Sequence, residues 1–296
     1  AGAELALYRA AADGSFTEEE EALVNVWISE TEAHRIAPLP DGIYYLAERT
    51  APPGFAPMEP IRVEWNETSP EEIRAENREK PGRLVLTKVD SKDQEWGLAG
   101  ALYEIQNEDT GERWQLETGE NGRAESGLLK TGKVTENGWT PYRFTLRELR
   151  PPKHYVLDRT VHTFSFAETG ENPLIVRREL SDEQTRITIA KTDFQTGHLV
   201  KGASLAVYRT KEKEGRYEAV GEPLDAWVSD GNSHVICGKL SAGEVYLLKE
   251  EKAPSGYGKE SPVLFSLSED GRQISSISSD CSVISFQASE EFPENI

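Results

Sequence analysis

The same pair of sequence elements occurs three times along this chain, at intervals of about one hundred residues. One element is a Gly-Ala stretch with alternating apolar residues, seen as AGAELALYR, LAGALYEIQ and VKGASLAVYR. The other carries a glutamate followed by proline, seen as YYLAERTAPPGF, FTLRELRPPKHY and YLLKEEKAPSGY. The glycines and glutamates that mark them are Gly2, Gly100, Gly202, Glu48, Glu148 and Glu250. A period this long exceeds a solenoid unit and predicts tandem domains.

Short alternating segments such as LVLTKV, RITIAK and VLFSLS, separated by Gly, Asn and Asp, indicate strands and hairpins. Residues 15–27 are open to two readings, a short capped helix or an acidic loop before a strand. The chain is therefore predicted to be all-β, with three tandem immunoglobulin-like antiparallel β-sandwiches in an elongated arrangement. Their expected bounds are 1–80 (repeat 1), 81–183 (repeat 2) and 184–296 (repeat 3), joined by short polar linkers.

Charge and composition exclude several classes of function. The 33 basic and 52 acidic residues give a net charge of −19, which argues against nucleic acid and anionic membranes as partners. No apolar run approaches the length of a membrane span and no leader is visible, so a soluble or already processed segment is expected. Scattered histidines and the absence of hydrolase or phosphate-loop motifs argue against a turnover enzyme.

Cysteines and metal ligands are sparse. The two cysteines, Cys237 and Cys281, have no CxxC or Cys/His spacing, so no metal site and no cofactor is expected. Either one Cys237–Cys281 disulfide or two separate thiols would fit the sequence, because separation along the chain says nothing about geometry.

Each repeat points charged side chains toward its core. Alternate residues of a strand share a face, so Glu48 lies with Tyr44 and Leu46, and the other two glutamates lie with apolar residues in the same way. Lys88 in LVLTKVD and Lys191 in RITIAKTD end similar apolar alternations. Strand-end ion pairs are one reading of this pattern.

Covalent chemistry is the other reading of the inward charges. Burial favours a neutral amine, which is a nucleophile, and a neutral carboxyl, which polarises an amide and shuttles its proton. A neighbouring asparagine would then give a Lys–Asn isopeptide bond with loss of ammonia. Asn77 is a candidate acceptor, since it shares a face with Ile73 and Ala75 of the expected closing strand of repeat 1.

The order K-x-D, x-x-G-A and Y-x-L-x-E-x-x-A-P-x-G-Y resembles the Cna protein B-type domains of Gram-positive surface adhesins and pilins, in three tandem copies. The last motif is complete in repeat 3, has Phe55 for Tyr in repeat 1, and loosens to RPPKHY in repeat 2. The resemblance implies a prealbumin-like β-sandwich whose first and last strands are often joined by an isopeptide bond. By position it makes Lys88 and Lys191 the nucleophiles and Asn77 an acceptor. It gives the proton-shuttling role to three residues, Glu48, Glu148 and Glu250.

The chain departs from that family pattern in every repeat. Repeat 1 lacks an opening strand, so its lysine would come from outside the chain, either because the chain is trimmed or because another chain supplies the strand. In repeat 2 the closing segment LIVRREL places Arg178 where an acceptor is expected, and an Arg178–Glu148 pair would replace the bond. Asn172 or Asp182 would need a shifted register to serve. Repeat 3 closes with CSVISFQASEE and offers no visible acceptor, so at least one of repeats 2 and 3 is expected to lack the bond.

A structural stalk or pilin-like segment of an extracellular, cell-wall-attached protein is the leading functional hypothesis. Its expected partners are other copies or a neighbouring pilin, by strand donation. The alternative is an adhesin that binds a host matrix protein or glycan, with Trp139 in the insertion 130–142 as a candidate binding residue. The six tryptophans are spread over all repeats, which favours packing roles.

Overall fold

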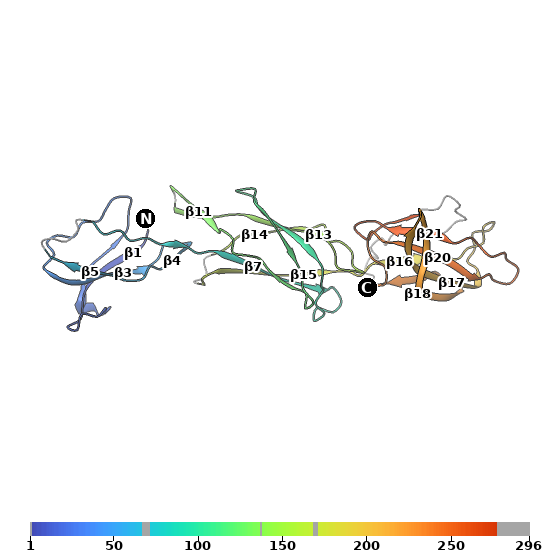
Figure 1. Ribbon diagram of the computed structural model, residues 1–296, viewed down its shortest axis with the longest axis horizontal. Helices are drawn as coiled ribbons and strands as arrows, with labels where there is room; N and C mark the ends of the chain where they lie inside the picture. The colour runs from blue at the N-terminus through green and yellow to red at the C-terminus, as the bar shows by residue number, and fades with distance from the viewer. Residues whose placement is uncertain (1, 67–71, 137, 168–170, 277–296) are drawn as a thin grey trace, which may run out of the picture.

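The computed structural model describes residues 2–66, 72–136, 138–167 and 171–276. Three groups of strands follow one another along the long axis of the molecule, and each group falls within one sequence repeat (Figure 1). Within the described residues the one helical element is a 3-10 turn, η1 (Glu20–Ala22), directly before a strand that starts at Leu23. The acidic run therefore forms neither a longer helix nor a plain loop, because it offers no apolar stripe to bury. No helix in the described part is long and apolar enough to cross a membrane.

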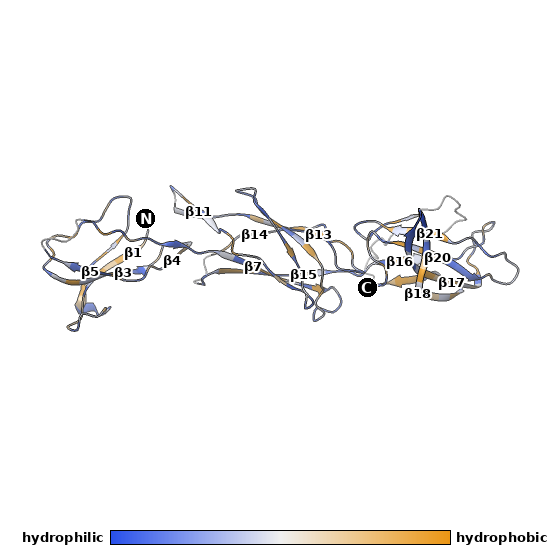
Figure 2. Cartoon of the chain, viewed as in Figure 1, coloured by the Kyte–Doolittle hydropathy of each residue, from blue (hydrophilic) through white to orange (hydrophobic). Residues whose placement is uncertain are grey.

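Repeat 1 is built on one four-stranded antiparallel sheet in the order β2-β1-β3-β5. Its core gathers the inward face of the two central strands, including Leu5, Leu7, Tyr44 and Leu46, and Figure 2 shows β1 as mostly apolar. A two-stranded sheet, β4-β6, leads toward repeat 2. The strands are β1 (Glu4–Arg9), β2 (Leu23–Ile28), β3 (Gly42–Thr50), β4 (Phe55–Ala56), β5 (Ile61–Trp65) and β6 (Arg78–Glu79).

Repeat 2 is a β-sandwich of two sheets, with a separate hairpin. One sheet has the order β10-β7-β15 and the other β14-β13-β8-β9, and Leu84, Leu86, Ile105 and Phe144 are buried between them. Strands β7 and β15 run parallel, whereas the other pairs are antiparallel. The strands are β7 (Gly82–Asp90), β8 (Leu102–Asn107), β9 (Arg113–Glu117), β10 (Arg123–Glu125), β11 (Gly132–Thr135), β12 (Gly138–Pro141), β13 (Phe144–Arg150), β14 (Val161–Phe164) and β15 (Leu174–Asp182).

Repeat 3 pairs a five-stranded sheet, β18-β17-β20-β21-β22, with a short sheet, β16-β19. Its core packs Ile187 and Ile189 of the short sheet against Val207, Tyr246 and other residues of the larger one. The strands are β16 (Arg186–Ile189), β17 (Lys201–Lys213), β18 (Arg216–Asp230), β19 (His234–Cys237), β20 (Val245–Lys252), β21 (Val263–Leu267) and β22 (Ile274–Ser276).

Direct contacts join consecutive repeats. At the first junction the Thr131 hydroxyl donates to the Lys80 carbonyl at 2.8 Å. At the second, the Leu157 N–H donates to the Asp270 carbonyl at 3.1 Å, and the Arg159 guanidinium lies 2.5 Å from the Asp270 carboxylate. These contacts fit the end-to-end arrangement in Figure 1.

Candidate crosslinking site

The three motif glutamates occupy one equivalent position in their sheets. Each lies on a central strand, opposite the third residue after the marker glycine, and each adjoins a β-bulge. The register pairs are Leu5 with Glu48, Tyr103 with Glu148 and Leu205 with Glu250. Bulges re-aim side chains locally, so the in-step sequence markers correspond to one repeated structural feature.

The prolines after each glutamate form the same turn three times. The sixth residue after the glutamate has a positive φ, and the seventh donates its N–H to the carbonyl of the fourth, a proline. A positive φ at the third turn position is characteristic of a type II turn and favours glycine. The positive-φ residues are Gly54 (+82°), His154 (+72°) and Gly256 (+87°).

This turn brings the chain back to the glutamate. In every repeat the N–H of the tenth residue after the glutamate donates to its Oε2. The donors are Met58 at 2.9 Å, Asp158 at 2.7 Å and Glu260 at 2.8 Å. The proline turn thus places a backbone N–H on the Oε2 atom of each glutamate and leaves the Oε1 atom for another partner.

Repeat 2 assembles three buried charged side chains from three strands. Lys88 Nζ of β7 lies 3.3 Å from Glu148 Oε1 of β13 and 2.5 Å from Asp182 Oδ1 of β15. Their side chains are 0%, 1% and 1% exposed. Two carboxylates around one ammonium leave an excess buried negative charge, which favours proton uptake or covalent neutralisation.

Asp182 reaches this site without the register shift expected from the sequence. Strand β15 runs on to Asp182, which has the same parity as Leu174 and lies one pleat beyond Leu180, the residue opposite Lys88. The expectation that Arg178 would pair with Glu148 is wrong, since its guanidinium donates to the Arg177 carbonyl at 3.0 Å. Asn172 precedes the strand.

Burial controls protonation of the two carboxyls. It raises the pKa of Glu148 above the usual value, against the lowering effect of Lys88. It raises the pKa of Asp182 to about 7; Lys88 opposes this and the Glu148 charge adds to it. Burial, followed by the nearby Glu148 charge, also pushes the pKa of Tyr103 well above its usual range. A carboxyl that holds a proton near neutral pH can both lose water and relay a proton.

The arrangement therefore has the parts of an amide-forming site. The Lys88 amine is in contact with the Asp182 carboxyl, so attack at Cγ would form a C–N bond and release one water. Glu148 would take a proton from the amine and return it to the departing oxygen.

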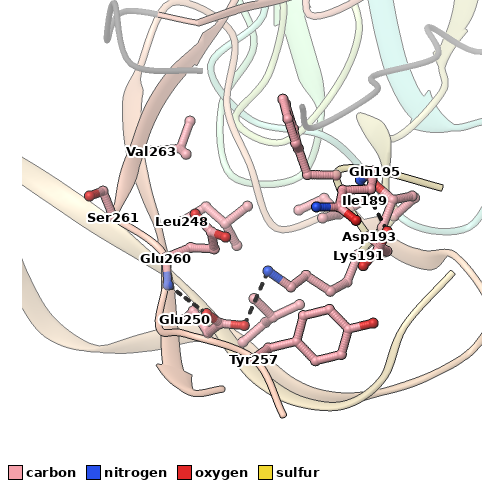
Figure 3. A pocket seen from close by; sticks show the side chains of 14 residues that line it. Ile189, Lys191, Asp193, Gln195, Leu248, Glu250, Tyr257, Glu260, Ser261 and Val263 are labelled. Atoms are coloured by element: carbon pink, nitrogen blue, oxygen red, sulfur yellow. Dashed lines mark hydrogen bonds and ion pairs between the residues drawn. The ribbon is translucent and has the colours of Figure 1, made fainter. Parts of the chain in front are cut away.

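Repeat 3 contains the lysine and the glutamate of the same site. Lys191 Nζ lies 3.2 Å from Glu250 Oε1, and Figure 3 shows it directed at that carboxylate beside the Glu260 backbone. A cavity of about 350 Å³ adjoins the pair and is also lined by Leu205 and Tyr257. In the described part of repeat 3, Glu250 is the one carboxylate in contact with Lys191 Nζ. The closing segment CSVISFQASEE lies outside the described residues.

Repeat 1 brings Glu48 and Asn77 together, as expected for an acid and its acceptor. The Asn77 amide donates to Glu48 Oε2 at 2.7 Å and to the Ala56 carbonyl at 2.9 Å. The expected closing strand is wrong in detail, because residues 72–77 form no ladder and pairing begins only at β6. Ile73 is accordingly exposed.

Trp139 and the cysteines stand apart from these sites. Trp139 pairs with Val134 within the β11-β12 hairpin, and its ring lies so close to Gly54 and Gly132 that a β-carbon on either would overlap it. Packing at the first junction accounts for this position, and ligand binding by Trp139 stays a prediction. The Cys237 thiol lies 3.5 Å from Gln184 Oε1, while Cys281 is outside the described residues, so their pairing also stays a prediction.

Two features of the site were not anticipated from the sequence. Tyr103 lies opposite Glu148, where repeats 1 and 3 have leucine opposite their glutamates. Tyr103 is the third residue after the marker Gly100, and this spacing, shared by all three repeats, could have placed it beside Glu148. The backbone of Gly122 packs against the backbone of Lys88. A β-carbon on Gly122 would lie 2.3 Å from the Lys88 carbonyl oxygen, so only glycine fits there. Such close backbone approach leaves no periodic pattern in a sequence.

One of the solved structures similar to this chain, with a TM-score above 0.5, shows the same kind of fold. The Bacillus anthracis TIE protein is 23% identical with a TM-score of 0.56, and the match covers 91% of this chain and 46% of that one. The chain thus spans less than half the length of that protein. A shaft pilin SpaA from Lactobacillus rhamnosus GG (double mutant) is 14% identical with a TM-score of 0.33, covering 64% of this chain and 94% of the pilin. A streptococcal ancillary pilin is 16% identical with a TM-score of 0.32, and the match covers 95% of this chain and 89% of the pilin.

No curated protein matches the chain. A family model described as the SpaA prealbumin-like fold domain matches residues 82–178 and 185–280. The two matches correspond closely to the strand groups of repeats 2 and 3 and together cover more than half of the sequence. The chain therefore belongs to the SpaA family of prealbumin-like fold domains.

Proposed function

We propose that the chain is a structural stalk or pilin-like segment of an extracellular surface protein, strengthened by an isopeptide bond between Lys88 and Asp182. The observation that carries this proposal is the buried contact of these two side chains beside Glu148. Membership of a family of prealbumin-like domains and the end-to-end arrangement of the repeats support it. The chemistry is a single self-modification and involves no catalytic turnover.

The topology of repeat 2 makes such a bond mechanically useful. Tension along the molecule enters repeat 2 at Gly82, the start of β7, and leaves it after Asp182, the end of β15. Because these strands are parallel neighbours, pulling would shear them past each other. A Lys88–Asp182 bond diverts the load from β7 directly into the outgoing linker. The rest of the sandwich, between the two residues, then bears none of the force.

The intact mass of the purified chain tests the bond. We expect a mass lower than that of the sequence by one water for the Lys88–Asp182 bond, because a carboxyl acceptor loses water and an amide acceptor would lose ammonia. Tandem mass spectrometry should find a branched peptide that joins β7 to β15. A further deficit located at Lys191 would identify an acceptor in repeat 3.

Matched variants separate the bond from an ion pair. Glu148→Ala should restore the missing water, since it removes the proton relay, and Glu120→Ala, at an exposed glutamate of the same repeat, should leave the deficit unchanged. An unmodified mass in the unsubstituted chain would show that the three charges persist as an ion pair and would overturn the crosslink.

We also propose that repeat 1 associates with a strand from a neighbouring surface protein. Another copy of this chain is a costly donor, because β7, with its lysine, is held on both edges by β10 and β15. A neighbour with a spare strand needs no such opening, and pairing with it would extend the fold of repeat 1.

A further inference from the structure

The proline turns of repeats 1 and 2 lie at the junctions with the repeats that follow them. In repeat 1 the Lys80 N–H donates to the Gly54 carbonyl at 2.8 Å, and in repeat 2 the Thr185 N–H donates to the His154 carbonyl at the same distance. Gly54 and His154 are the positive-φ residues of the two turns. The linker that leaves each of these repeats is therefore hydrogen-bonded to the turn that brings a backbone donor to the glutamate.

Repeat 3 contacts the loop of repeat 2 on both sides of Asp158, whose N–H donates to Glu148 Oε2 at 2.7 Å. On one side, the Leu157 N–H donates to the Asp270 carbonyl at 3.1 Å. On the other side, the Arg159 guanidinium lies 2.5 Å from the Asp270 carboxylate. A single residue of repeat 3, Asp270, therefore binds both chain neighbours of the residue that donates to the glutamate.

These contacts act on a segment that belongs to no sheet. Residues 156–160 lie between β13 and β14 and form no strand. A loop outside the sheets opens more readily than a strand, so contacts from another repeat have their largest effect there. Leu157 and Asp158 are partly buried, whereas the equivalent residues of repeat 3, Lys259 and Glu260, are exposed.

The contact with repeat 3 stabilises the loop of repeat 2 without being needed to form its hydrogen bond. In repeat 3 the exposed Glu260 donates its N–H to Glu250 Oε2 at 2.8 Å in the same way. Docking of a neighbouring repeat therefore changes how often the loop opens, and with it the fraction of time that the glutamate is held.

We infer that Asp270 of repeat 3 is a positioning residue for the crosslinking site of repeat 2, so that docking of repeat 3 speeds bond formation in repeat 2. The inference rests on the crosslinking chemistry proposed for repeat 2. A proton relay requires its carboxylate to be held within reach of both partners, here the Lys88 amine and the departing oxygen of Asp182. Asp270 touches none of the reacting atoms and acts through the Asp158 N–H. The C–N bond still forms with release of one water, and only the rate changes.

The first junction shows the same relation, with Trp139 of the β11-β12 hairpin as the contacting residue. Its ring lies against Gly54, four residues before Met58, whose N–H donates to Glu48 Oε2. Trp139→Ala should therefore raise the hydrogen-exchange rate of the Met58 amide, because the turn of repeat 1 loses its neighbour. Trp96→Ala, at an exposed tryptophan of the same repeat, should leave that rate unchanged.

Hydrogen exchange of the full chain tests the inference at the Asp158 amide. Asp270→Ala and Arg159→Ala should each raise its exchange rate about two- to fivefold, the effect of losing a partly exposed ion pair. The double variant should exchange no faster than Asp270→Ala alone, since both substitutions remove the same contact. Lys153→Ala, at an exposed lysine of the same turn, should leave the rate unchanged. Exchange of β16 and β17 in the same molecule reports whether repeat 3 stays folded.

Bond formation is followed by the intact mass of the full chain during cell-free synthesis. The missing water of repeat 2 should appear about two- to fivefold more slowly in Asp270→Ala and in Arg159→Ala, because the relay is held for less of the time. Water loss at the unsubstituted rate in both variants would overturn the inference alone, even if the Asp158 amide exchanges faster. If the unsubstituted chain never loses water, the proposed crosslink is wrong and the inference fails with it.

Discussion

Replacing Lys88 with methionine is expected to lower the free energy of unfolding of repeat 2 by about 5 kcal/mol or more. A bond between residues 94 positions apart removes chain entropy from the unfolded state worth about 4–5 kcal/mol in the loop-closure model. The substitution also leaves Glu148 and Asp182 buried without a cation, which adds to the loss. Hydrogen exchange of β7 and β15 measures the effect within repeat 2, with repeats 1 and 3 as references in the same molecule.

Two further variants show which part of this loss comes from the bond. Lys92→Met changes an exposed lysine of the same repeat and should leave the exchange rates as they were. Asp182→Asn removes the charge but keeps an acceptor, so the bond can still form with loss of ammonia. If Asp182→Asn lowers the stability of repeat 2 as much as Lys88→Met does, the stabilisation comes from the charges and a covalent origin is wrong.

The fold was predictable because its signals are local. Apolar alternation and the repeated Gly-Ala and Glu-Pro elements indicate strands, and the structure pairs them with the glutamates at one register position. The parity of Glu148 and Lys88 with their apolar neighbours likewise predicted their burial. A side chain's face depends only on its own strand, so one sequence suffices to assign it.

The acceptor of repeat 2 was harder to predict because strand ends depend on partners. The sequence LIVRREL shows where apolar alternation stops, but β15 continues to Asp182 since its parallel partner β7 supplies hydrogen bonds that far. Residues 72–77 show the opposite error. Their alternation predicts a strand, yet no described strand of repeat 1 is a parallel neighbour equivalent to β7, so residues 72–77 form no ladder and pairing is confined to β6.

The interaction that holds each glutamate was also beyond pattern reading. The proline motif indicated a turn, but the sequence does not show that the N–H of the tenth residue after the glutamate donates to its carboxylate. The donors Met58, Asp158 and Glu260 share no side-chain chemistry, because only their backbone takes part.

The stability lost in Lys88→Met is expected to grow as pH rises from about 4 through 7. Burial raises the pKa of Asp182 and of Glu148, and Lys88 has the largest opposing effect on each, so removing Lys88 leaves both pKa values raised further. The folded variant then keeps protons that the unfolded chain has released above its ordinary carboxyl pKa. A carboxyl whose pKa is raised in the folded state stabilises the fold at low pH, and this contribution is lost as the pH rises through the folded-state pKa. The linkage slope reaches about 1.4 kcal/mol per pH unit for each such proton.

The unsubstituted chain should lack this dependence at Asp182, because a carboxyl converted to an amide does not titrate. Other carboxyls act in the opposite sense: hydrogen bonds lower the pKa of Asp90 and Asp225 in spite of partial burial, so both forms lose stability in strong acid. The difference between variant and unsubstituted chain cancels that shared effect. Urea unfolding followed at about pH 5 and about pH 8 gives this difference directly. A stability difference that is the same at both pH values would contradict this prediction. It would mean that Glu148 and Asp182 are ionised and hydrated in the folded Lys88→Met variant, so that Lys88 is what keeps water out of the site.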